Sequence, residues 1–105
     1  MRDFRKQLVR KGFHFHTIPA GKYRMSIQAN ECAYCQPRGT LLDPVGYTSM
    51  EVVIKKRHKK FEAWVHPRDI KGVKPETVKR FGSDCIGGWI PVEEIQELYE
   101  LLLKT

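Results

Sequence analysis

Residues 13–29 have the sequence FHFHTIPAGKYRMSIQA, and this segment carries the clearest fold signal in the chain. Apolar and polar residues alternate in residues 13–18 and again in residues 23–29, which is typical of β-strands with one covered face. Proline and glycine in residues 19–22 predict a turn between the two strands. We therefore expect a β-hairpin. The side chains expected on its covered faces are Phe13, Phe15, Tyr23, Met25 and Ile27.

A second hairpin is predicted between residues 47 and 66. Residues 47–56 are rich in β-branched side chains, which favour strands. Residues 61–66 are the expected partner strand, and Pro67 ends it. The cationic residues between the two strands are expected at or near the tip of this hairpin.

Helical periodicity is clearest in residues 92–103. Pro91 suits the first helical position, and Glu93 and Glu94 complement the positive end of the helix dipole. Apolar side chains recur every three or four residues and so form one stripe that faces a core. The residues of this stripe are Val92, Ile95, Leu98, Tyr99 and Leu102.

Two shorter helices are predicted. Residues 3–11 are expected to form an N-terminal helix, because Phe4 and Leu8 lie one turn apart and Gly12 can end it. Residues 74–82 are expected to hold two helical turns, with proline near the start and glycine at the end.

The remaining segments complete the predicted architecture. Residues 30–46 form a long loop with no sustained period, and loops of this length are often functional. Residues 86–90 form a short strand in which two glycines make a tight turn or bulge. The order of elements predicts an α+β fold: a small antiparallel sheet built from two hairpins, flanked by an N-terminal and a C-terminal helix. We expect residues 1–105 to make a single compact domain.

The charge of the chain is strongly basic. Its 105 residues include 19 Lys and Arg against 12 Asp and Glu, which gives a formal net charge of +7. Residues 51–80 hold ten Lys and Arg against four acidic residues, whereas residues 81–105 hold one against five. A basic surface favours acidic partners. No apolar run approaches the ~18 residues that cross a bilayer, and residues 1–6 lack a signal-peptide pattern. We therefore expect a cytoplasmic protein with no membrane partner.

The leading functional hypothesis is a small basic binding protein that contacts nucleic acid through its second hairpin. The candidate binding residues are Lys55, Lys56, Arg57, Lys59 and Lys60. Cations along a phosphate backbone add affinity by releasing counterions, and exposed aromatic rings stack on bases. The aromatic candidates are Tyr34, Tyr47 and Trp64. One competing interpretation is a solvated turn whose cations discourage edge-to-edge pairing of strands. Another is that the acidic C-terminal helix supplies the counter-charge within the molecule.

Two alternatives concern protein partners. The chain is either a protein-interaction module or an inhibitor that engages an acidic protein surface, or it forms a homodimer. The homodimer hypothesis rests on Leu101 and Leu103, which exceed what one covered helix face needs. No nucleophile or general base lies in a recognisable catalytic context, so we do not expect an enzyme.

A further alternative is a small zinc-stabilised domain. Cys32 and Cys35 form a C-x-x-C motif, which is half of a tetrahedral zinc site, and Cys85 is the third candidate ligand. A histidine would be the fourth ligand. The histidines are His14, His16, His58 and His66. The competing interpretation, which we favour, is that these cysteines pack a loop as small apolar residues and that the protein needs no cofactor.

Overall fold

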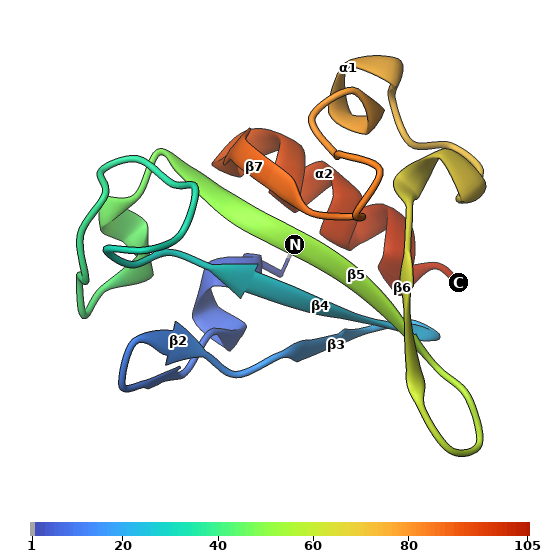
Figure 1. The fold of residues 1–105 in the computed structure, drawn as a ribbon, viewed down its shortest axis with the longest axis horizontal. Coiled ribbons are helices and arrows are strands. Elements are labelled where there is room, and N and C mark those ends of the chain that lie inside the picture. Colours follow the sequence, from blue (N-terminus) through green and yellow to red (C-terminus); the bar gives the residue numbers. More distant parts are fainter. Residues whose placement is uncertain (1) are drawn as a thin grey trace.

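A computed structural model describes residues 2–105, and its centre is a five-stranded antiparallel sheet (Figure 1). The strands are β3 (Ile18–Ala20), β4 (Tyr23–Gln28), β5 (Ser49–Arg57), β6 (Glu62–Val65) and β7 (Gly87–Pro91). Their order is β3-β4-β5-β6, and β7 also pairs with β5. β4 occupies one edge of β5, whereas β7 and β6 follow one another along the other edge. The prediction of an α+β fold with antiparallel strands is confirmed. The predicted sheet of two hairpins is incomplete, because β7 joins it.

The core lies between this sheet and the helix α2 (Val92–Leu103). Alternate residues of β4 and β5 point into it, and α2 packs against β3, β5 and β7. Figure 1 shows α2 lying across one side of the sheet. The predicted stripe of α2 is confirmed at Ile95, Leu98, Tyr99 and Leu102, all of which are buried, while Val92 is half-buried. The periodic signals were therefore correct where strand and helix patterns were longest.

The predicted N-terminal helix is wrong. A single 3-10 turn, η1 (Phe4–Gln7), occupies its first half, and Asp3 caps this turn by accepting a hydrogen bond from the Arg5 amide at 2.9 Å. The second half is extended: β1 (Arg10–Lys11) pairs with β2 (His14–Phe15) in a separate two-stranded sheet. Gly12 has a φ of +65° and makes the tight turn between them instead of ending a helix. Phe4 and Leu8 are buried, as predicted, without a helix to carry them.

The first predicted hairpin is also revised. Its first strand is broken into β2 and β3, so Phe13 falls in the β1–β2 turn and is 66% exposed instead of covered. Its turn begins at Gly21, because residues 19 and 20 already pair with β4. Gly21 has a φ of +62°, and a Cβ atom there would clash with the carbonyl group of Leu102 at the end of α2. Close packing of the helix end on this turn therefore requires glycine.

The remaining elements are short. Of residues 74–82, only α1 (Pro75–Val78) is helical, and 3-10 turns form at η2 (Pro44–Gly46) and η3 (Pro67–Asp69). Residues 30–46 form the expected long loop, in which Gln36 makes an isolated bridge to Ser49. Within residues 2–105, no helix has both the length and the apolar character needed to cross a membrane.

Candidate nucleic-acid interface

The basic run lies at the tip of the β5–β6 hairpin, as the sequence predicts. β5 ends at Arg57 and β6 begins at Glu62. The His58 amide closes the turn by donating to the Phe61 carbonyl at 2.8 Å, and the two rings stack with centroids 4.9 Å apart. Figure 1 shows the tip extending away from the rest of the molecule. This geometry leaves the tip side chains free to reach a partner.

The structure divides the five predicted cations between two settings. Arg57, Lys59 and Lys60 are exposed at the tip. Lys55 and Lys56 are half-buried on β5, where successive side chains point to opposite faces. Lys55 lies on the open face of the sheet, and Lys56 lies on the face that α2 covers. The candidate contact surface therefore contains four of the five residues.

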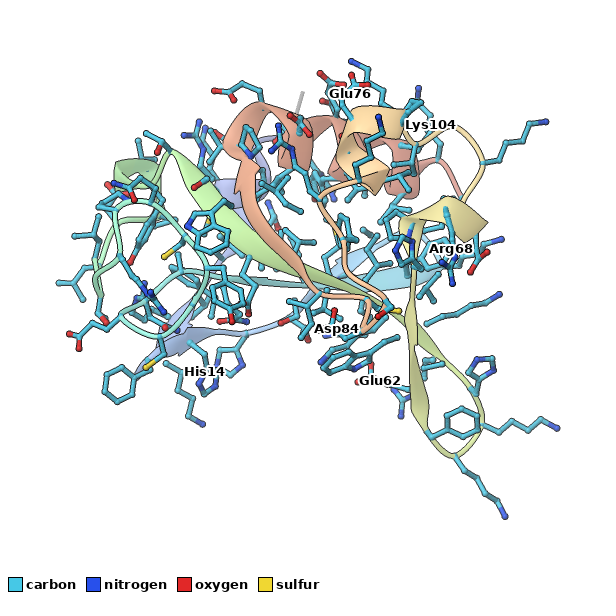
Figure 2. The ribbon with its side chains drawn as sticks, turned by 45° about the horizontal axis from the view of Figure 1, so that its top comes forward. His14, Glu62, Arg68, Glu76, Asp84 and Lys104 are labelled. Carbon is cyan, nitrogen blue, oxygen red and sulfur yellow. The ribbon has the colours of Figure 1, made fainter. Side chains whose placement is uncertain are left out.

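A cation that the sequence did not single out joins the hairpin. Arg24 of β4 lines a hollow of about 470 Å³ together with Arg57, Lys59 and Lys60. The Arg24 guanidinium donates to the Thr17 hydroxyl at 2.9 Å and lies 3.9 Å from a carboxylate oxygen of Glu62. Figure 2 shows Glu62 where the hairpin leaves the sheet. We call this set of four cations around the hollow the basic hollow.

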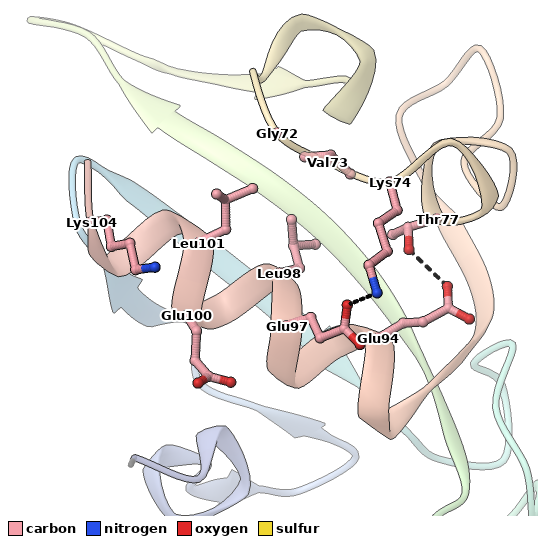
Figure 3. Close-up of a pocket in the computed structure, with 10 residues that line it drawn as sticks. All are labelled: Gly72, Val73, Lys74, Thr77, Glu94, Glu97, Leu98, Glu100, Leu101 and Lys104. Atoms are coloured by element: carbon pink, nitrogen blue, oxygen red, sulfur yellow. Dashed lines mark hydrogen bonds and ion pairs between the residues drawn. The ribbon is translucent and has the colours of Figure 1, made fainter.

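The acidic helix does not neutralise the hairpin. Glu94 of α2 pairs with Arg80 at 2.9 Å. Glu97 pairs with Lys74 at 2.6 Å, and Figure 3 shows this second pair. These pairs lie beside a groove of about 290 Å³ between α2 and residues 72–77. Throughout residues 2–105, no acidic side chain forms an ion pair with any of the five predicted cations. The carboxylate that the structure places in the lining of the basic hollow is Glu62, which pairs with Arg24.

The three aromatic candidates have different settings. Trp64 is 51% exposed and lies directly opposite Lys55 on the open face of the sheet. Tyr34 is 46% exposed in the long loop. Tyr47 is only 1% exposed, so its prediction as a stacking surface is wrong. Its hydroxyl group is used inside the protein to hold that loop.

The predicted zinc ligands are not gathered into a site. Cys32 is exposed, whereas Cys35 is buried and its thiol donates to the carbonyl groups of Asn30 and Pro37, both at 3.4 Å. Burial raises the pKa of the Cys35 thiol. The half-buried thiol of Cys85 instead lies 4.0 Å from the Trp64 carbonyl oxygen. Among the residues that the structure describes, no group of three or more His, Cys, Asp and Glu side chains can hold a metal ion.

The histidines are equally separate in their roles. His14 and His16 are exposed, with ring centroids 6.4 Å apart, and Figure 2 shows His14 far from the hairpin tip. His58 belongs to the tip. His66 is buried, and its Nδ1 atom accepts a hydrogen bond from the Arg68 amide at 3.2 Å, which caps η3. Within residues 2–105, no histidine therefore joins the cysteines in a group that could hold a metal ion.

The two leucines behind the homodimer hypothesis lie at the end of α2. Leu101 and Leu103 are both half-buried, and Leu103 packs against the core.

Comparisons with protein-family models, with curated proteins and with solved structures find no match to this chain. Its function must therefore be inferred from its own residues and their geometry.

Proposed function

We propose that this protein binds nucleic acid and that the basic hollow contacts the phosphate backbone. The observation that supports this most directly is the convergence of Arg24, Arg57, Lys59 and Lys60 on one depression. Two strands and one turn supply these residues. The fold therefore holds close together four cations that repel one another. Like charges this close repel one another unless an anion is supplied.

The geometry of the hollow suits a phosphate group. Arginine presents planar donors that match phosphate oxygens, and lysine adds mobile point charges. Glu62 is the one carboxylate in the lining, and it lies beside Arg24, which it can orient. Exposed charge in this position also increases the rate of association with a polyanion.

The test removes three cations from the tip. In Arg57→Gln/Lys59→Gln/Lys60→Gln, we expect weaker binding to mixed-sequence DNA and RNA alike. The slope of log affinity against log salt should shrink by about one unit for each lost contact. The matched control is Lys11→Gln/Lys71→Gln/Lys79→Gln, which removes the same charge from exposed positions outside the hairpin. Affinity is measured by fluorescence anisotropy at about 50 mM and about 200 mM salt.

Two results would contradict this proposal. Equal losses in the tip variant and the control would show that net charge alone drives binding. An unmodified protein that binds neither DNA nor RNA at low salt would reject nucleic acid as the ligand. The basic hollow would then be assigned to an acidic protein surface, the alternative that its charge also fits.

A further inference from the structure

Two exposed aromatic rings lie against each other at the start of β5. The ring centroids of Tyr34 and Trp89 are 4.8 Å apart, with 31° between their planes. Tyr34 is 46% exposed and Trp89 is 50% exposed. Exposed aromatic rings that lie together offer a large apolar contact surface, and such surfaces often mark interaction sites. We call Tyr34 and Trp89 the aromatic pair.

The backbone is arranged to present Trp89. Between the paired residues Met50–Ile90 and Val52–Gly87, β5 has one residue and β7 has two, which is a β-bulge. Trp89 has a φ of +49°, an unfavourable value for a bulky residue. Its amide leaves the β5 ladder and donates to the Tyr34 carbonyl at 2.9 Å. The bulge therefore turns the Trp89 indole away from the core, whereas the side chain of the next residue, Ile90, points into the core.

The loop side of the pair is equally constrained. A Cβ atom on Gly88 would lie 3.0 Å from the Cβ atom of Tyr34, so glycine allows the loop to approach β7 closely. The Tyr34 amide donates to the Glu51 carboxylate at 3.3 Å. The two rings are thus held by backbone contacts and do not depend on each other alone for position. Such pre-positioned rings lose little conformational entropy when a ligand stacks on them.

The aromatic pair and the basic hollow lie on one face of the sheet. The strand registers place Arg24, Lys55 and Trp64 side by side on the face opposite the α2 core. The aromatic pair lies at the level of Glu51 on β5. Glu51 is four residues from Lys55 along β5, or roughly 13 Å at the usual rise per residue. Exposed rings and cations therefore follow β5 from its start to the hairpin tip.

We infer that the ligand is single-stranded nucleic acid and that its bases stack on Trp89 and Tyr34 while its phosphates lie in the basic hollow. This inference rests on the proposed function and adds the class of nucleic acid. Bases in a duplex are stacked on one another and cannot cover a protein ring, whereas those of a single strand can. The cations interleaved with the rings, including Arg38 at 6.0 Å from the Tyr34 ring centroid, favour this ligand over an apolar protein surface.

The experiment compares three oligomers of about 12 nucleotides: single-stranded oligo-dT, a strand of abasic sites with the same phosphates, and a duplex. We expect the unmodified protein to bind oligo-dT most tightly. Trp89→Gly, which keeps a residue suited to positive φ, and Tyr34→Leu should each weaken binding to oligo-dT by roughly 5- to 150-fold. Their affinity for the abasic strand should stay unchanged, because its phosphate contacts remain.

The control variant is Phe13→Leu, which removes an even more exposed ring from the β1–β2 turn. It should leave all three affinities unchanged. Tyr34→Leu keeps the backbone carbonyl that holds Trp89, so it tests the inference even where Trp89→Gly lowers folding stability. If both variants bind oligo-dT as the unmodified protein does, base stacking is rejected and the phosphate contacts stand. If the unmodified protein binds none of the three oligomers, nucleic-acid binding itself is rejected.

Discussion

Arg10 and Tyr47 are 37 residues apart in the sequence, and the Arg10 guanidinium donates a hydrogen bond of 3.1 Å to the Tyr47 hydroxyl group. The same hydroxyl accepts the Leu41 amide at 2.7 Å and lies within hydrogen-bond distance of the Ala29 and Gly39 carbonyl oxygens. One buried side chain therefore ties β1, the end of β4 and the long loop together. The loop in turn holds Tyr34 against Trp89.

This contact predicts the effect of removing one oxygen atom. Tyr47→Phe should lower the free energy of unfolding by about 1–3 kcal/mol, because partly buried partners of the hydroxyl lose their hydrogen bonds. Urea denaturation measures this loss. The control is Tyr34→Phe, whose side chain is half exposed to water and which should change stability by less than about 0.5 kcal/mol. Equal stability of the two variants would show that the Tyr47 hydroxyl does not hold the loop.

The Glu94 carboxylate predicts a dependence of stability on pH. It accepts a hydrogen bond from the Arg80 side chain at 2.9 Å. It also accepts one from the Thr77 hydroxyl at 2.8 Å, which Figure 3 shows. The hydrogen bond from Arg80, with that from Thr77, lowers the pKa of Glu94 below its usual value. Because the folded pKa lies below the unfolded value of about 4.3, the stabilisation is present above that value and is lost as the pH falls through the folded pKa.

We therefore expect Glu94→Gln to be less stable than the unmodified protein at pH 7 and closer to it in acid. The measurement is the free energy of unfolding in urea from neutral pH to about pH 3. Glu93→Gln, at an exposed position of the same helix turn, is the control. A constant difference between Glu94→Gln and the unmodified protein at every pH would contradict the assigned role.

The two cysteines of the C-x-x-C motif should differ in reactivity. Cys32 is exposed, whereas burial both shields the Cys35 thiol and raises its pKa, which disfavours the reactive thiolate. In the folded protein, iodoacetamide should modify Cys32 well before Cys35, and mass spectrometry of the digested protein can follow both sites. In a chemical denaturant the two rates should converge. Equal rates in the folded state would contradict the separate settings of the two thiols.

Local periodicity explains what could be predicted and what could not. β4 and α2 were predictable because six or more consecutive residues repeat one pattern, and β5 was predictable because its residues are rich in β-branched side chains. Neither signal requires knowledge of distant partners. The predicted helix over residues 3–11 was wrong because the four-residue spacing of Phe4 and Leu8 does not specify a helix. A 3-10 turn followed by extended chain buries both side chains as well. The exposure of Phe13 depends on β2 pairing with β1, and nothing in residues 13–18 specifies that pairing.

The candidate site also has features that local sequence predicts and features that depend on contacts between distant segments. The sequence by itself determined that five cations lie in or beside a reverse turn between two strands, because charge and turn are both local properties. Only the tertiary structure decided that Arg24 joins them, that Tyr47 is buried and that Trp89 faces solvent beside Tyr34. Strand register places Arg24 and one bulge turns Trp89 outward, and a shift of one residue in a strand moves every side chain to the opposite face. Tyr47 is held inside by hydrogen bonds to Arg10 and to the backbone of the long loop. Such relationships arise between segments, so no single segment contains them.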